Sequence, residues 1–308
     1  MSNFNEPAFV MTYGKSGSGK TVDCMYSLPN ALFIAPPGAL KPWKNIIGLP
    51  NQPARANNVG TIEEATALLR QEGPKRRWQA LVVDDFSLMS DRTHQQAEER
   101  GLTKFVFWGY MRKTLMEFRD VAREFGLHIV VNCHIRNPHT DEKKGWIMGG
   151  PMLPGVMPED FPKSVDACLR VVPDENYPRW PFVYSGDGRN AEFVEKTRLG
   201  DAITTLPMNL GEILRLEYGM DGPLGIKRAP GMEWQEDVVE KVATALTAMP
   251  FLSDGWKETI TNTTPGILKK AGGNKLHAVW TLRDIVARAV LRQMKLRGHD
   301  DALAAFGR

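Results

Sequence analysis

Eight consecutive residues near the start of the chain have the composition and spacing of a phosphate-binding loop: Gly14, Lys15, Ser16, Gly17, Ser18, Gly19, Lys20 and Thr21. The glycines of such a loop let successive backbone N–H groups turn toward phosphate oxygens. Its lysine, Lys20, reaches the β and γ phosphates of a nucleotide, and the Thr21 hydroxyl is a ligand for Mg²⁺. The pattern predicts that all eight residues bind ATP together with Mg²⁺.

A pair of acids supplies the second half of such a site. The segment ALVVDDF (80–86) is apolar up to Val83 and then places Asp84 and Asp85 at the end of a buried strand. Asp84 is predicted to hold the Mg²⁺ through water. Asp85 is predicted to orient the attacking water as a catalytic base. The alternative is that one of the two only caps the helix that follows.

A further strand ends in Asn132-Cys133-His134, beside the acid strand. His134 is a candidate catalytic residue that senses the γ-phosphate or links hydrolysis to the next loop. The alternative is a histidine that is satisfied within the structure.

Strand-like and helix-like segments alternate through the first two thirds of the chain, which predicts an α/β fold with a mostly parallel, doubly wound sheet. The predicted strands are 8–13, 31–36, 80–86, 127–134, 167–172, 181–185 and 192–197. The last of these follow one another without helices, which predicts an antiparallel section at one edge of the sheet. The predicted helices are the stretch after the phosphate loop, 61–71 and 103–125.

The remainder of the chain is organised differently. Residues 136–164 are rich in Gly and Pro and lack periodicity, which is typical of a long functional or disordered loop. After about residue 206 the chain becomes helical, with amphipathic helices at 232–249 and 278–298 separated by a Gly/Thr/Pro-rich stretch. We expect an ATPase core over 1–215 and a smaller helical region over 216–308.

Composition is that of a soluble globular protein, with 42% hydrophobic and 24% charged residues among 308. No uninterrupted apolar run is long enough for a membrane helix, and the N-terminus lacks signal-peptide features, so we expect a cytoplasmic protein without a membrane partner. Cys24, Cys133 and Cys168 lie in apolar surroundings and are predicted to be reduced and buried. Basic residues outnumber acidic ones after residue 253, which fits either a polyanionic partner or a solvated helix face.

The phosphate loop, the LVVDD segment, the VVNCH strand end and Lys196-Thr197-Arg198-Leu199-Gly200 occur in the order used by RecA-like ATPases, which this chain therefore resembles. The KTRLG segment is similar to the K-x-R element of the RadA and hexameric-helicase branches. A GGPMLPG loop (149–155) and the Asp187-Gly188-Arg189 stretch bring the resemblance closer to RecA-like ATPases of bacteriophages associated with single-strand annealing and recombination. The resemblance covers residues 8–215.

This resemblance implies that Lys196 and Arg198 are catalytic residues acting on the nucleotide of a neighbouring subunit, which requires a homo-oligomer, either ring or filament. Such a cation stabilises charge on the transferred phosphoryl group. The alternative for both is an ordinary charged edge strand. The resemblance also implies single-stranded DNA as a partner, phage replication or recombination proteins as further partners, and the host cytoplasm as the compartment.

One departure concerns the catalytic acid that follows the second strand in RecA. Here that segment carries Pro36 and Pro37. Either Asp85 takes the role of base, or hydrolysis is slow and ATP mainly controls assembly.

In RecA-like proteins the loops after the acid strand and the next strand contact DNA, which here correspond to 88–104 and 136–164. The second loop holds the DNA-binding candidates Arg136, Lys143, Lys144 and Trp146, since cations beside an aromatic suit phosphate contact and base stacking. Acidic residues in both loops keep open the alternative of solvated charge. The last helix offers another basic surface, made of Arg283, Arg288, Arg292, Lys295 and Arg297.

The preferred hypothesis is an oligomeric ATPase that acts on DNA in phage recombination, annealing or replication. The alternatives are a nucleotide-gated assembly protein with little turnover and a subunit of a DNA translocation or packaging motor.

Overall fold

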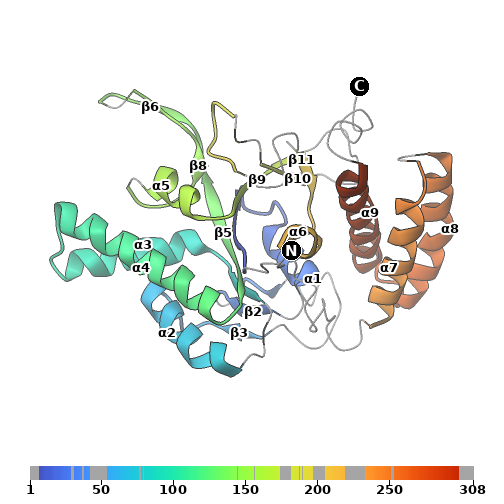
Figure 1. Cartoon of the computed structure of the whole chain (residues 1–308), viewed down its shortest axis with the longest axis horizontal. Helices are drawn as coiled ribbons and strands as arrows, with labels where there is room; N and C mark the ends of the chain where they lie inside the picture. The colour runs from blue at the N-terminus through green and yellow to red at the C-terminus, as the bar shows by residue number, and fades with distance from the viewer. Residues whose placement is uncertain are drawn as a thin grey trace, which may run out of the picture.

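The structure is a computed structural model of the whole chain. It describes residues 7–28, 31–36, 38–41, 54–75, 78, 80–143, 145–155, 157–173, 182–186, 188, 190–196, 205–218, 233–250 and 253–297. Figure 1 shows a central sheet between two groups of helices.

A nine-stranded, mostly parallel sheet forms the centre of the described chain. Eight of its strands run side by side in the order β11 (Thr205–Pro207), β10 (Phe182–Ser185), β9 (Ala167–Pro173), β1 (Phe9–Gly14), β5 (His128–Arg136), β4 (Ala80–Val83), β2 (Ala31–Ile34) and β3 (Arg55–Ala56), and the short β8 (Gly150–Pro151) pairs with β5. The pairs from β9 to β3 are all parallel, whereas β10 and β11 are antiparallel to their neighbours. The predicted antiparallel edge is therefore confirmed for β10 and β11, while β9 is parallel to β1.

The position of β5 in the sheet matters for the site. It lies between β1, which leads into the phosphate loop, and β4, which ends at the acid pair. Side chains that follow each of these parallel strands meet at one edge of the sheet. The predicted α/β class, with a mostly parallel sheet and helices between its strands, is the observed one.

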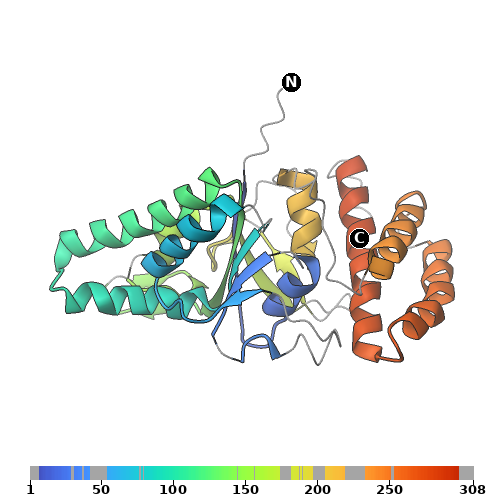
Figure 2. The ribbon, with the colours of Figure 1, turned by 90° about the horizontal axis from the view of Figure 1, so that it is seen from below.

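Helices cover both faces of the sheet, as Figure 2 shows from below. One face carries α2 (Ile62–Glu72), the short η2 (Gly73–Lys75), α3 (Phe86–Glu99), α4 (Lys104–Glu124) and α5 (Met157–Ser164). The other carries α1 (Lys20–Ser27), α6 (Leu210–Tyr218), α7 (Glu233–Thr247), α8 (Asp254–Lys270) and α9 (Lys275–Arg297).

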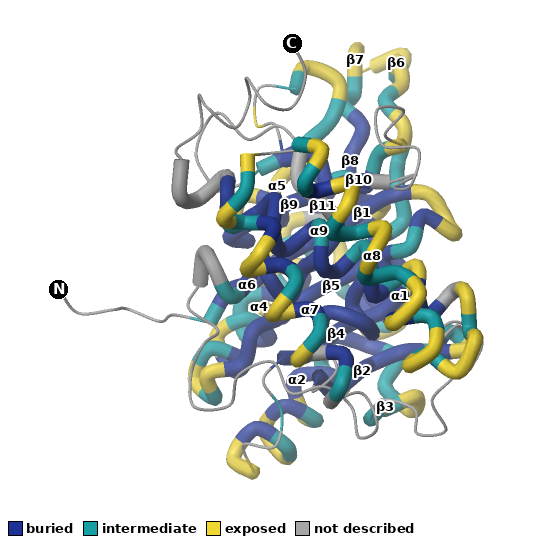
Figure 3. The backbone as a smooth tube through the Cα atoms, turned by 90° about the vertical axis from the view of Figure 1, so that its right-hand side faces the viewer, coloured by how far each residue is buried: buried dark blue, intermediate teal, exposed yellow. Residues whose placement is uncertain are grey.

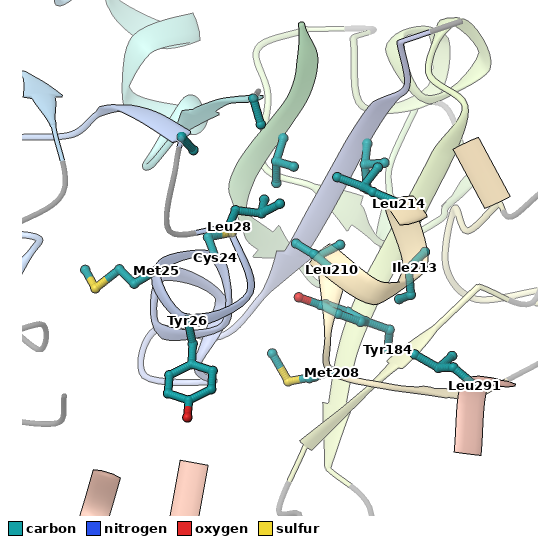
Figure 4. Packing of buried hydrophobic residues seen from close by; sticks show 14 of the residues in the cluster. Cys24, Met25, Tyr26, Leu28, Tyr184, Met208, Leu210, Ile213, Leu214 and Leu291 are labelled. Atoms are coloured by element: carbon teal, nitrogen blue, oxygen red, sulfur yellow. The ribbon is translucent and has the colours of Figure 1, made fainter. Parts of the chain in front are cut away.

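Strand side chains alternate between two buried clusters because successive residues of a strand point to opposite faces. In β1, Val10 belongs to the cluster under α1, α6 and α7–α9, whereas Phe9 and Met11 belong to the cluster under α2–α5. Figure 4 shows Tyr184 of β10 and Leu210 of α6 beside the residues of α1. The sheet is thus the middle layer of three, which explains why its strands are apolar on both faces.

Three helices, α3, α5 and α8, occupy segments that the sequence did not predict as helical. Residues 88–104, expected as a DNA-contacting loop, lie mostly in α3, whose first turn is capped by Asp85. The Gly/Thr/Pro-rich stretch forms α8 in spite of Pro265, and the hydroxyls of Thr263 and Thr264 donate to carbonyls one turn earlier. Pro265 removes the helical N–H that would bond the carbonyl of Thr261, and the two hydroxyl bonds add to the turn just before that carbonyl.

Residues 136–164 are not a structureless loop. They contain the hairpin of β6 (His139–Asp141) and β7 (Gly145–Ile147), then β8 and α5. The hairpin projects beyond the sheet and its residues are exposed or half-buried (Figure 3).

The predicted strand at 192–197 is wrong for the residues described there. Phe193 pairs with Gly149 and Lys196 pairs with Cys168, each in an isolated bridge. Because each end of the segment bonds to a different part of the chain, no continuous ladder forms.

All three cysteines are free and buried, as predicted. No described helix is long and apolar enough to cross a membrane. The division at residue 215 stays a prediction, and one buried cluster contains both Val10 of the sheet and Ile285 of α9.

Candidate functional site

The phosphate loop connects β1 to α1 in the predicted way. Gly17 and Gly19 have φ angles of 78° and 91°, a left-handed conformation that favours glycine. A Cβ on Gly14 would lie 3.0 Å from the Cβ of Val171, so the loop also begins where only a glycine fits easily. The backbone therefore explains all three glycines of the loop.

Lys20 is buried at the start of α1, and its amino group is held inside the loop. Nζ donates to the carbonyls of Gly14 at 2.9 Å and Lys15 at 3.0 Å, and to the Ser18 hydroxyl at 3.2 Å. Burial lowers the pKa of Lys20, and the nearby Asp84 opposes that shift. The ammonium is thus poised over the loop without a carboxylate bonded to it, which suits an anionic ligand.

Asp84 is the centre of a polar chain across the strand ends. Its Oδ1 accepts from the Thr21 hydroxyl at 2.8 Å and from the Asn132 amide at 3.1 Å. Asn132 in turn accepts from the Thr12 hydroxyl at 2.7 Å. Burial raises the pKa of Asp84, and the two bonds from Asn132 and Thr21 oppose this.

These hydrogen bonds bring together Thr21 and Asp84, the two residues predicted to bind metal. A hydroxyl and a carboxylate are hard oxygen donors of the kind that Mg²⁺ takes beside the phosphates of a nucleotide. The sequence did not predict that Asn132 orients Asp84. The signal that could have indicated it is a polar residue near the end of a buried strand, two positions before His134.

Asp85 occupies a conformation that is uncommon for a residue with a side chain. Its φ is 61°, and among the described residues no other non-glycine has a positive φ. Its Oδ1 accepts from the backbone N–H of Leu88 at 3.1 Å, so it caps α3. The same oxygen lies 3.6 Å from Nε2 of His134. The helix cap that was the alternative to a base is therefore present, and the carboxylate also faces the cavity.

His134 stands at the end of β5, where its backbone N–H donates to the Ser87 hydroxyl at 3.0 Å. This hydrogen bond fixes the end of β5 to the start of α3. The imidazole itself is half exposed and faces Asp85, so it contacts one acid while remaining open to a ligand.

A cavity of about 440 Å³ joins these groups. Its lining includes the loop residues from Ser16 to Val22, both acids, Asn132 to His134, and also Pro36 and Ala39. Pro36 therefore borders the phosphate cavity from the end of β2, where the sequence comparison expected a catalytic acid. Among the described lining residues, the carboxylates are Asp84 and Asp85.

Of the residues predicted to act across a subunit boundary, the structure describes Lys196 but not Arg198, which lies outside the described residues. The amino group of Lys196 donates to the carbonyls of Val165 at 2.6 Å and Lys163 at 3.2 Å. In a single chain it therefore binds the end of α5 and the turn that follows. Its role across a subunit boundary stays a prediction.

Three of the four DNA-binding candidates are described, and Lys144 lies outside the described residues. Trp146 is 56% exposed in β7, and Lys143 lies in the turn between β6 and β7. Arg136 is different, because it donates to the carbonyl of Met148 at 2.8 Å and lies 4.0 Å from Glu159. The hairpin thus presents Lys143 and Trp146, while Arg136 supports its base.

The basic surface predicted on the last helix is wrong for Arg288 and Arg292. Arg283 lies over the ring of Trp280 at 4.1 Å, and the side chains of Lys295 and Arg297 lie outside the described ones. Arg288 is 3% exposed and lies within 4 Å of Asp284, Glu212 and Glu240. Arg292 binds Glu212 and Glu240 as well. These arginines face the packing surface of α6, α7 and α9, because their carboxylate partners come from those helices.

Comparisons with known proteins find a fold likeness only. Neither a family model nor a curated protein matches the chain. Among solved structures, the chain is similar to one described as the crystal structure of the RadB recombinase, with 14% identity and a TM-score of 0.36 over 55% of this chain and 77% of that one.

Proposed function

We propose that this protein is an ATPase that acts on single-stranded DNA in recombination, annealing or replication, of the kind encoded by bacteriophages and working in the cytoplasm. The observation that carries the proposal is the cavity in which Lys20 and the Thr21–Asp84 pair face one another. These are the groups that a nucleotide and its metal require, and they come from the start of α1 and the end of β4.

The residues present fit ATP and Mg²⁺. Lys20 currently bonds to loop oxygens, and phosphate oxygens are stronger acceptors for the same ammonium. Thr21 and Asp84 would hold the Mg²⁺, directly or through water. The metal would supply positive charge to the β and γ phosphates when bound. Asn132 keeps the Asp84 carboxylate oriented toward the cavity.

For hydrolysis we propose that Asp85 orients the attacking water and accepts its proton. His134 lies 3.6 Å from that carboxylate and faces it across the cavity. Replacement of Asp85 by Asn retains the cap to Leu88 through the amide oxygen, but removes the base. Single-turnover hydrolysis should then fall steeply while nucleotide binding is retained.

We further propose that an assembled neighbour completes the site with Lys196 and Arg198. Lys196 would exchange its bonds to the Lys163 and Val165 carbonyls for phosphate oxygens of the adjacent subunit. The expected result for Arg198→Ala is normal ATP binding with hydrolysis lost. Turnover at the wild-type rate in this variant would exclude the role across the boundary.

The β6–β7 hairpin is the proposed DNA contact, through Trp146 and Lys143. Titration of a labelled oligothymidine should show binding that weakens as salt rises, because each phosphate contact releases counterions. Trp146→Ala should weaken binding by about 1–3 kcal/mol if a base stacks on the indole. Lys257→Ala, an exposed cation on α8, is the matched control and should bind as wild type does. Unchanged affinity for Trp146→Ala would remove the hairpin from the DNA site.

A second function is favoured by Pro36 and by the cap that Asp85 provides. With no acid at the end of β2, ATP could act as a switch for assembly with little turnover. Measurement of mass in solution with ATP, alongside the turnover rate with and without single-stranded DNA, separates the two functions. Assembly driven by ATP in the absence of DNA binding would favour the switch.

A further inference from the structure

A second cavity, on the face of the sheet that carries α2–α5, belongs to no part of the proposed nucleotide site. It has a volume of about 620 Å³, against about 440 Å³ for the phosphate cavity. Its lining comes from one side of α4 and from α5, and we call it the α4–α5 groove.

The floor of the α4–α5 groove is apolar and fixed. It is formed by Met111, Leu115, Met157 and Phe161, all buried. The ring of Phe161 packs against Phe86 at 5.6 Å between centroids, so the floor continues into the main core. A floor anchored in this way does not collapse, and its methionines adapt to side chains of different shape.

Exposed apolar side chains continue the groove toward the start of α4. Phe105, which lines the groove, is 92% exposed, and its neighbour Val106 is 67% exposed. Figure 2 shows α3 and α4 extending well beyond the sheet, with this end of α4 at the tip. Continuous apolar surface that reaches solvent at a groove is typical of a binding site for another molecule.

The rim of the groove is positively charged. Arg112, Arg119 and Lys163 line it, against one acid, Asp160. Arg112 is exposed and forms no ion pair with the residues that the structure describes. Lys163 and Arg119 have exposed partners only. Such pairs contribute little and exchange readily with a carboxylate of another molecule.

We propose that the α4–α5 groove docks a short acidic peptide segment of a partner protein, with one large apolar side chain inserted over the floor. The apolar anchor would contact Met111, Leu115 and Phe161. Carboxylates beside the anchor would bind Arg112 and Arg119. This interaction does not depend on nucleotide or on the proposed ATPase activity.

The geometry favours such a peptide over two other occupants. Single-stranded DNA needs several exposed aromatic faces on which successive bases stack, whereas of the aromatic side chains in the groove lining Phe105 is exposed, Trp108 is half-buried and Phe161 is buried in the floor. A second copy of the chain bound about a two-fold axis would place the same rim against itself, bringing Arg112 and Arg119 near like charges.

The experiment selects a displayed random-peptide library against the full chain and measures the best peptide, labelled with fluorescein, by anisotropy. Arg112→Glu is compared with Lys113→Glu, which makes the same charge change at the next residue of α4, outside the groove lining. We expect selected peptides rich in Asp or Glu with an aromatic or Leu anchor. Their affinity should fall at least about tenfold for Arg112→Glu and less than about twofold for Lys113→Glu.

Both positions are exposed, and unchanged melting temperatures will show that both variants fold. Equal affinity of the two variants, or selection of neutral or basic peptides, overturns the proposal. Two further results also overturn it. One is loss of oligothymidine binding in Arg112→Glu alone, which would assign the groove to DNA. The other is a lower mass in solution for Phe105→Ser, which would assign it to a second copy.

Discussion

Two buried clusters of charge, one at the phosphate loop and one along α9, use the same kinds of residue in opposite ways. The Lys20 ammonium bonds to two backbone carbonyls and a hydroxyl, and the carboxylate near it, Asp84, is bonded to Thr21 and Asn132. The positive charge of the Lys20 ammonium is therefore available to an anionic ligand. At α9 the Arg288 guanidinium is surrounded by carboxylates of its own chain.

This difference separates a binding site from a structural one. A buried cation whose partners are neutral loses solvation without gaining a counter-charge, and an anion that supplies one binds tightly. A buried cation that already has several carboxylate partners gains little from a further anion. Its removal lowers stability, because those carboxylates lose a counter-charge. The phosphate cluster should therefore govern ligand affinity, and the α9 cluster should govern stability.

The largest effect is expected for Arg288→Ala. Removal of Arg288 takes one counter-charge from Asp284 and Glu212, while Glu212 keeps Arg215 and Arg292, so the free energy of unfolding should fall by about 3 kcal/mol. Urea unfolding followed by circular dichroism measures it. Lys257→Ala, which breaks an exposed pair with Asp254, is the control and should leave the urea midpoint unchanged. Similar stability of the two variants would contradict a structural role for the α9 cluster.

Lys20→Ala should weaken ligand binding and leave the stability of the fold nearly unchanged. Loss of the ammonium should weaken binding of Mg²⁺ and a labelled ATP analogue by roughly 100-fold, because charge-assisted bonds to phosphate are lost. Unfolding should change little, since the amine bonds only to loop oxygens. Fluorescence titration gives the affinity. Retained binding in this variant would contradict the proposed nucleotide site itself.

Asp23 lies in α1, three residues after Lys20, and it makes the free energy of unfolding depend on pH. Burial raises its pKa from 3.8 to about 6 although Tyr184 and Leu210 donate to it. The folded state therefore holds a proton that the unfolded state releases. This contribution is complete below the unfolded pKa of 3.8 and is lost as pH rises through about 6.

Asp23→Asn keeps an acceptor for Tyr184 and cannot ionise. Relative to wild type it should gain about 2 kcal/mol in unfolding free energy between about pH 4 and pH 7. Urea unfolding at both pH values measures the difference. An identical pH dependence in the two proteins would show that Asp23 is not the titrating group.

The smallest effect is expected where α1 contacts α9 directly. The Thr281 hydroxyl lies 2.8 Å from the Tyr26 hydroxyl and accepts from the Gln235 amide at 2.9 Å. Thr281→Val keeps the shape of the side chain but removes its hydrogen bonds with the Tyr26 hydroxyl and the Gln235 amide, at a cost of about 1–2 kcal/mol. Nucleotide affinity should stay within about twofold of wild type. A larger change in affinity would show that α9 acts on the phosphate loop.

The sequence by itself determined the phosphate loop, the acid strand and the alternation of strands and helices. These depend on local requirements: glycines where φ is positive, apolar residues on strands covered on both faces, and a lysine and threonine at the start of a helix. The positions of Lys20, Thr21 and Asp84 follow from such requirements, so their spacing along the chain was enough.

Only the tertiary structure decided which charges are free. Arg288 and Lys143 are both cations, yet one is enclosed by carboxylates from α6, α7 and α9 and the other lies in an exposed turn. The residues that neutralise or orient a charge come from distant parts of the chain, as Asn132 does for Asp84 across 48 positions. Pairing over such separations depends on how the helices pack on the sheet, and no local pattern contains it.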